Sequence, residues 1–184
     1  SDIDAALEGV SGEERPRGLL RIAATSIAER FLSGPLLASF VEHCPDVTLD
    51  VTVTDEEFDI VAAGFDAGVR LGEVIEQDMI AVPVTGDQRE VAVAAPGYLA
   101  RHGTPQHPHD LVRHRCIGWR RSMGVAPHRW EFEENGVSFD VQVEPQITTN
   151  DMLLMIRSAV AGGGVTFGPE EVFHAHIERG ELVP

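Results

Sequence analysis

The pattern of apolar and polar residues divides the chain into short segments that alternate between strand and helix. Residues 18–24 (GLLRIAA) are mostly apolar, as in a buried strand, and residues 47–53 (VTLDVTV) alternate between two faces. A helix-like run between them reaches Cys44, and residues 55–63 predict a second helix before a third strand at 65–72. Strand, helix, strand, helix, strand in short segments predicts parallel pairing through right-handed crossovers.

A similar pattern follows in the second half of the chain. Residues 79–84 (MIAVPV) predict a fourth strand, and the strand-helix pattern restarts at 89–96. Residues 115–120 predict a further strand. Alternating runs then flank Asn135 and Gly136, and this dipeptide predicts a hairpin because both central positions of its turn need a positive φ.

The last part of the chain predicts helix, strand and helix. The helix after 150 is capped by Asn150 or Asp151 and ends at the glycines 162–164. Residues 165–169 then predict a strand, and 170–178 a final helix. A strand-helix-strand unit therefore occurs twice, before and after about residue 88. Two such α/β units joined by a hinge leave a crevice, and ligands of open α/β sheets bind at the carboxyl ends of the strands.

Composition and charge exclude several classes of function. The chain has 14 basic and 30 acidic residues and a net charge of −16, whereas DNA affinity comes mainly from Lys and Arg. We therefore expect this segment to bind neither nucleic acid nor anionic membranes. No run approaches the ~20 apolar residues of a membrane span. Cys44 and Cys116 are far apart, which favours a reducing cytoplasm over a disulfide framework.

In order and spacing, these segments resemble the effector-binding domain of a LysR-type transcriptional regulator. The resemblance covers about residues 17–184. The matching pieces are GLLRIAA with Thr25-Ser26, PLLASFVEHCPDVTLDV, DIVAAGFDAGVRLGE, VAVAAPGYLARHGTPQHPHDLVRHRCIGW and TTNDMLLMIRSAVAGGGVTFGPEEVFHAHIERGELV.

The resemblance implies an α/β fold of two Rossmann-like lobes joined by two crossover strands, as in type 2 periplasmic binding proteins. The first lobe is expected to comprise 18–87 plus 166–184, and the second 88–165. Residues 1–17 are expected to be the remnant of a linker helix. The winged helix-turn-helix that binds DNA in this family is absent from the chain, and the family usually continues beyond residue 184 into a final strand and helix.

The turn after the first strand is the first candidate for ligand binding. Thr25 and Ser26 offer hydroxyls at a helix N-terminus, where free N–H groups and the helix dipole favour an anionic group. Ser26 could also simply cap its helix with Glu29 in a capping box, and the two roles can coexist. The resemblance adds Thr54 and Asn150, whose turns face the cleft in the family.

By the same resemblance, Glu73 and Trp119 fall near positions that line the pocket. A solvated carboxylate and a core aromatic residue are the plainer interpretations of these two. Arg70 could complement an acid or point outward. We therefore expect a small-molecule effector, such as an organic acid or a related metabolite, and no cofactor.

Two histidine pairs have spacings that could hold a metal ion. His107 and His109 lie in a proline-rich loop, whereas His174 and His176 lie on a predicted helix where positions i and i+2 diverge. Neither pair has a cysteine or an assured third ligand nearby. We expect no metal site.

Catalytic motifs are equally weak. The glycines 162–164 follow a helix and precede a strand, the reverse of a phosphate-binding loop. Cys116 and His114 could share one face of a strand as a thiol nucleophile and its base, but a buried cysteine is commoner. No G-x-S-x-G elbow is present.

Three functions remain, with the regulator's sensory domain favoured. It would bind its effector between the lobes and control DNA binding and transcription through the missing N-terminal domain. The resemblance implies a cytoplasmic homodimer that pairs helices 35–41 and 152–160 of two subunits, or a tetramer of the full-length protein. The alternative is a solute-binding protein of a transport system, and the third is an enzyme on a similar fold.

Overall fold

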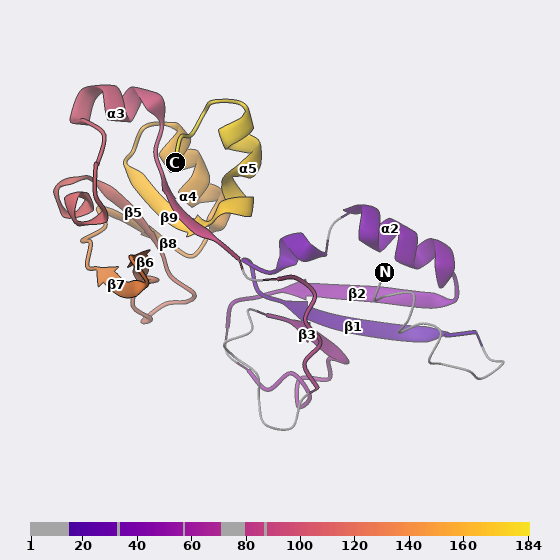
Figure 1. Ribbon diagram of the computed structural model, residues 1–184. Helices are drawn as coiled ribbons and strands as arrows, with labels where there is room; N and C mark the ends of the chain where they lie inside the picture. Colours follow the sequence, from indigo (N-terminus) through magenta and orange to yellow (C-terminus); the bar gives the residue numbers. More distant parts are fainter. Residues whose placement is uncertain (1–14, 33, 57, 71–79, 87) are drawn as a thin grey trace. The chain divides into compact units, whose positions relative to one another are not determined.

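The chain folds into two compact units, which are described separately. The computed structural model describes residues 15–32, 34–56, 58–70, 80–86 and 88–184 (Figure 1). The boundary between the units falls between Val74 and Ile75. We call these the first unit and the second unit.

The first unit is a three-stranded parallel sheet with one long helix. Its strands are β1 (Gly18–Ala24), β2 (Val47–Val53) and β3 (Ala67–Val69), in the order β2-β1-β3. A short 3₁₀ helix, η1 (Glu29–Phe31), and the helix α2 (Gly34–His43) connect β1 to β2 (Figure 1). This is the crossover connection that parallel strands require.

The register of the first sheet aligns the carboxyl ends of all three strands. Ala24, the last residue of β1, pairs with Val53 at the end of β2 and with Val69 at the end of β3. The residues that follow these strands therefore meet at one edge of the sheet. Thr25 and Thr54 are among them.

The second unit has a four-stranded sheet in the order β4-β9-β5-β8 and a separate hairpin, β6-β7. Strand β5 is parallel to β8 and β9, whereas β4 is antiparallel to β9. The elements of this unit are β4 (Glu90–Val93), α3 (Pro96–His102), η2 (Pro108–Arg113), β5 (Cys116–Trp119), β6 (Trp130–Glu134), β7 (Val137–Val141), β8 (Ile147–Thr149), α4 (Met152–Val160), β9 (Val165–Pro169) and α5 (Glu170–Glu178).

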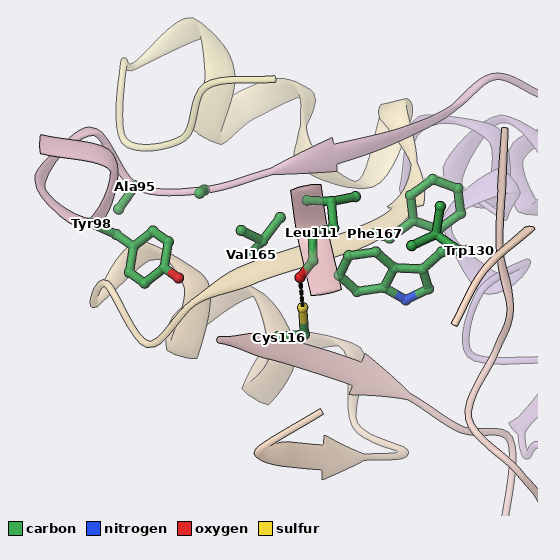
Figure 2. Packing of buried hydrophobic residues seen from close by; sticks show 9 residues of the cluster. Ala95, Tyr98, Leu111, Cys116, Trp130, Val165 and Phe167 are labelled. Atoms are coloured by element: carbon green, nitrogen blue, oxygen red, sulfur yellow. Dashed lines mark hydrogen bonds between the residues drawn. The ribbon is translucent and has the colours of Figure 1, made fainter. Parts of the chain in front are cut away.

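Two apolar clusters cover the two faces of this sheet. Val91 and Val93 on β4 belong to the cluster that contains residues of α4 and α5, whereas Ala94 belongs to the cluster of α3, η2 and the hairpin. Successive residues of a strand point to opposite faces, so the helices α4 and α5 pack on one side and the hairpin on the other. Figure 2 shows the cluster on the side of α3, η2 and the hairpin, which includes Ala95, Tyr98, Leu111, Cys116, Trp130, Val165 and Phe167.

Several predicted elements are confirmed. Strands β1 and β2 have the predicted bounds, and Asn135 and Gly136 adopt φ values of 53° and 77° in the turn of the β6-β7 hairpin. Asp151, rather than Asn150, caps α4, because its carboxylate accepts the backbone N–H of Leu154 at 2.8 Å.

Two other predictions are wrong. The helix predicted at 55–63 is replaced by a turn at 60–64, with the Ala62 N–H donating to the Asp59 carboxylate at 2.9 Å. Residues 80–84 form no strand, and Ile80 is 95% exposed. Of the strand predicted at 65–72, the structure shows Ala67–Val69, and 71 and 72 lie outside the described residues.

The segment predicted to return to the first lobe lies in the second unit. Strand β9 pairs with both β4 and β5, and the chain then continues into α5. The hydrogen bonds between Ala94 and Val183 attach the last residues to the same sheet. The pattern at 165–178 was interpreted correctly as strand and helix, but periodicity does not specify which strands pair. The lobe boundaries of the complete protein stay a prediction.

Candidate functional site

The carboxyl edge of the first sheet gathers three of the predicted ligand-binding residues. The backbone continues the sheet past the strand ends, since the Thr25 N–H donates to the Val69 carbonyl at 3.1 Å and the Thr54 N–H to that of Ala24 at 2.9 Å. Ser26 follows Thr25 in the same turn. We call Thr25, Ser26, Thr54 and Asp55 the first strand-end cluster.

Asp55 occupies the position where an anionic ligand group was expected. Its Oδ1 accepts the backbone N–H of Ser26 at 2.8 Å. The capping box of Ser26 with Glu29 is wrong, because η1 begins at Glu29 after Ala28, with no side-chain cap. The Asp55 carboxylate therefore accepts the Ser26 N–H, which the sequence analysis expected to bind an anionic ligand.

The two hydroxyls of this turn are available instead. Thr25 Oγ1 and Ser26 Oγ are buried and have no hydrogen-bond partner among the residues that the structure describes. Buried polar atoms are nearly always hydrogen-bonded, so such a pair marks a place for a ligand or ordered water. Thr54 differs, because its Oγ1 accepts the backbone N–H of Glu56 at 3.2 Å.

Arg70 contacts its own unit at the end of β3. Its Nη2 donates to the Phe58 carbonyl at 3.3 Å, and its Cζ lies 5.7 Å from the centre of the Phe58 ring. The guanidinium is thus held by local contacts. Glu73, the acidic residue among the predicted site residues, lies outside the described residues.

The remaining predicted residues lie in the second unit, at the ends of β5 and β8. Trp119 pairs with Thr149 in the parallel register, which puts these two strand ends side by side. The indole Nε1 of Trp119 is buried and has no hydrogen-bond partner within the described ranges. Asn150 is exposed. We call Trp119, Thr149, Asn150 and Asp151 the second strand-end cluster.

An aspartate also holds the backbone in this second cluster. The Asp151 N–H donates to Thr149 Oγ1 at 3.0 Å, and the Asp151 carboxylate caps α4. In both strand-end clusters the aspartate is the second residue after the end of a parallel strand, and its carboxylate accepts a backbone N–H. Asp55 was missed by the sequence analysis, although a carboxylate two positions after a strand was a signal for it.

Three of the four histidines in these pairs lie beside carboxylates of the chain itself. Within the part of the chain that the structure describes, no three His, Cys, Asp or Glu residues come together in a group that could hold a metal ion. His176 Nδ1 lies 2.7 Å from the Glu181 carboxylate, and His174 pairs with Glu178 at 3.3 Å. These histidines have structural partners on α5 and just beyond it.

Cys116 is packed as a core residue. Cys116 is 1% exposed, and its thiol lies 3.6 Å from the Leu111 carbonyl oxygen (Figure 2) and 3.5 Å from that of His114. Burial raises the pKa of the Cys116 thiol to about 11. The His114 ring lies 3.2 Å from the Tyr98 hydroxyl, and desolvation lowers its pKa. The pair is therefore unsuited to nucleophilic catalysis, which needs a thiolate.

No helix in the described ranges is both long enough and apolar enough to cross a membrane.

Comparisons with known proteins identify the family. The sequence pattern of the LysR substrate binding domain matches residues 13–184. The chain is 38% identical over 183 residues to a Pseudomonas aeruginosa protein that is named as a transcriptional regulator, covering 99% of this chain and 60% of that protein. It is 34% identical to the HTH-type transcriptional regulator YcaN of Escherichia coli, covering 91% of this chain and 54% of YcaN.

Solved structures show the same fold. CrgA, a LysR-type transcriptional regulator from Neisseria meningitidis, superposes with a TM-score of 0.82 at 24% identity, covering all of this chain and 61% of CrgA. The isolated CrgA regulatory domain gives a TM-score of 0.76 at 25% identity, with 92% of this chain and 81% of that domain covered.

The chain belongs to the LysR substrate-binding domain family. The predicted fold class, the two-lobed α/β fold of type 2 periplasmic binding proteins, is confirmed by these neighbours. A solute-binding protein of a transport system is not favoured, because the relatives are transcriptional regulators. The chain spans about 60% of the length of the first of these relatives and 54% of the second.

Proposed function

We propose that this chain is the effector-sensing part of a LysR-type regulator that controls transcription in the cytoplasm. DNA would be bound by an N-terminal winged helix-turn-helix, and this acidic chain would contribute ligand binding without catalysis. The observation that carries the ligand-binding proposal is the pair of buried hydroxyls of Thr25 and Ser26, which find no partner in the described structure. They lie where three parallel strands end, the usual place for a ligand of an open α/β sheet.

The effector is a small metabolite, with an organic acid as the first class to test. Asp55 already accepts the Ser26 N–H. An acid at this edge is therefore expected to be bound through the Thr25 and Ser26 hydroxyls rather than through that backbone group. The Trp119 indole N–H offers a further donor in the second strand-end cluster. Asn150, Thr54 and Glu73 stay candidates from the family resemblance.

Removing the hydroxyls is the test of this assignment. A thermal-shift screen of a metabolite panel supplies the ligand, and isothermal titration then measures its Kd. Thr25→Val and Ser26→Ala are each expected to weaken binding about fivefold to tenfold, since each removes about one net hydrogen bond. Thr54→Val is expected to have a smaller effect, because its hydroxyl already accepts the Glu56 N–H.

Thr48→Val is the matched control for this series. Thr48 is exposed near the amino end of β2, away from the carboxyl edge, so its replacement should leave the Kd unchanged. Unchanged affinity in both Thr25→Val and Ser26→Ala would disprove the site assignment. Normal binding by Thr48→Val together with weak binding by those two variants would support it.

We also propose that the chain forms homodimers through α2 and α4. Helix α2 has no buried residue among those described, although it carries Leu36 and Val41, and α4 leaves Leu153 68% exposed. Burying these apolar side chains against a second copy would stabilise a dimer. Light scattering after size exclusion at micromolar concentration is expected to give twice the 20.0 kDa chain mass, and Leu153→Glu to give a monomer. A monomeric wild-type chain would exclude this interface.

A further inference from the structure

Two adjacent side chains at the carboxyl end of β5 carry buried N–H groups without an acceptor. The Nε of Arg120 and the indole Nε1 of Trp119 are both buried, and neither has a hydrogen-bond partner among the residues that the structure describes. Arg120 is the first residue after β5, and its backbone N–H donates to the Thr149 carbonyl at the end of β8 at 2.9 Å. The backbone of Arg120 is therefore held by a neighbouring strand, whereas the Nε of its side chain lacks an acceptor.

The charge around Arg120 is unusual for this acidic chain. Residues 111–130 contain five arginines and no Asp or Glu, although the whole chain has a net charge of −16. The acidic residues of nearby elements have other partners, because Asp151 caps α4 and the Glu90 carboxylate lies 3.1 Å from the His128 ring. No ion pair joins Arg120 to a carboxylate within the described ranges. A partly buried guanidinium without an acceptor is costly, so we expect its acceptor to come from outside the chain.

The segment that begins at Arg120 is a loop held at both ends. The His128 N–H donates to the Trp119 carbonyl at 2.7 Å, which closes residues 120–127 into a loop. The contact between the His128 ring and Glu90 attaches the far end of this loop to β4. Groups that are held in place before binding lose less conformational entropy when a ligand binds. This anchoring therefore favours ligand recognition by Arg120.

The first strand-end cluster offers a different electrostatic environment. The Asp55 carboxylate lies beside its turn, with Oδ1 2.8 Å from the Ser26 backbone nitrogen. The Thr25 and Ser26 hydroxyls can donate hydrogen bonds to an acid, but Asp55 would repel the charge of that acid. Of the two clusters, the second therefore suits an anionic group better.

We propose that the Arg120 guanidinium and the Trp119 indole N–H bind a carboxylate group of the effector, and we call this pair the carboxylate subsite. A guanidinium presents its N–H groups in one plane and matches the two oxygens of a carboxylate. Hydrogen bonds between such charged groups are stronger than those between neutral groups. This inference rests on the proposed function, because it takes the effector to bind at strand ends, and it assigns recognition of the ligand's charge to the second unit.

Benzoate is the probe for this subsite, titrated into the isotope-labelled 184-residue chain and followed by NMR. Saturable shifts are expected for the Arg120 Nε–H and Trp119 indole N–H signals, with a Kd on the order of 1 mM. The indole of Trp130, which is 2% exposed in the core, is the internal control and should not shift. Benzamide has the same ring without the charge, so it is expected to bind about tenfold more weakly.

Three outcomes of this titration would overturn the carboxylate subsite. The first is the absence of saturable shifts at both donors at benzoate concentrations far above that Kd. The second is equal affinity for benzoate and benzamide, which would mean that the charge is not recognised. The third is tighter binding of inorganic phosphate than of benzoate, which would make a phosphate ester the ligand class instead.

A pair of charge-matched variants locates the carboxylate. Arg120→Gln removes the guanidinium and is expected to weaken benzoate binding about tenfold, while benzamide affinity stays unchanged. Arg129→Gln is the matched control, because Arg129 is exposed in the same segment and its replacement removes the same charge. This control should bind benzoate like wild type. Equal losses in the two variants would show a general charge effect and overturn the subsite.

Trp119→Phe gives a second test that does not require Arg120→Gln to fold. It removes the other donor and keeps an aromatic ring, so benzoate binding is expected to weaken about fivefold. Unchanged benzoate affinity in this variant and in Arg120→Gln would overturn the subsite and leave the effector site proposed above intact.

The variants of the first strand-end cluster separate this inference from the proposed function. Thr25→Val and Ser26→Ala are expected to bind benzoate like wild type, because its charge is bound in the second unit. An effector from the metabolite screen whose Kd responds to Arg120→Gln, but to neither of these two variants, would support the carboxylate subsite and disprove the assignment to the first cluster. The converse response would overturn the carboxylate subsite alone.

Discussion

Replacing Phe173 by alanine is expected to lower the free energy of unfolding of the second unit by about 3–5 kcal/mol. Phe173 lies on α5, is 0% exposed, and packs in the apolar cluster with Val93, Ile117 and Met155. Alanine would remove most of a fully buried ring and leave a cavity against the sheet. A loss of this size is a large fraction of the stability of a small domain.

Tryptophan fluorescence during urea unfolding measures this loss of stability in the second unit. Trp119 and Trp130 are the two tryptophans of the chain, and both lie in the second unit. The matched control is His174→Ala at the next position of α5. The His174 side chain is 62% exposed and pairs with Glu178, whose side chain is 67% exposed, so its loss should change stability by less than about 0.5 kcal/mol.

The same experiment tests which unit the last segment stabilises. The sequence analysis assigned 166–184 to the first lobe, whereas α5 packs on β4 and β9. If Phe173→Ala left the fluorescence transition unchanged and destabilised only a probe in the first unit, the packing described here would be contradicted. A shift of the fluorescence midpoint to lower urea supports it.

Local patterns predicted the elements whose form depends on nearby residues. The alternation of apolar and polar residues was sufficient to predict β2. The dipeptide Asn135-Gly136 was sufficient to predict the hairpin turn, because the positive φ values of this turn are a local requirement. The cap of α4 was predicted to within one residue for the same reason. Such elements need no information on distant parts of the chain.

Predictions failed where a distant contact decides the structure. The backbone N–H of Ser26 is held by Asp55, 29 positions later, so the local capping box with Glu29 does not form. The predicted helix over 55–63 fails for a local reason instead, because the Asp59 carboxylate accepts the Ala62 N–H three positions later and Gly64 follows at φ 76°. The periodicity of apolar residues shows neither the Asp55 contact nor the Asp59 contact, because both depend on polar side chains.

The grouping of the candidate site residues was predictable, whereas their individual roles were not. Parallel strands bring residues after their carboxyl ends together, and this rule was enough to group Thr25, Ser26 and Thr54. The roles of the individual side chains were not predictable. Whether a hydroxyl is unpartnered, like that of Ser26, or already bonded, like that of Thr54, depends on atomic distances.

Cys116 is expected to react with iodoacetamide at pH 9 about 50-fold more slowly than an unperturbed thiol. A thiol with a pKa of 9.0 is half ionised at that pH, whereas one with a pKa of about 11 is about 1% thiolate. Burial is the cause, since the thiol is 1% exposed and surrounded by the apolar cluster of Figure 2. The rate is measured by mass spectrometry in a Cys44→Ala background, so that Cys116 is the single thiol.

The raised pKa also makes stability depend on alkaline pH. The folded chain holds the Cys116 proton more tightly than the unfolded chain, so its contribution is complete below pH 9 and is lost as pH rises toward 11. The free energy of unfolding is expected to fall by about 2 kcal/mol over this range. In Cys116→Ala this part of the decline should disappear, although the variant is less stable at every pH. Rapid alkylation of a chain that is still folded by tryptophan fluorescence, or an equal alkaline decline in Cys116→Ala, would show that the thiol is not held neutral by its packing.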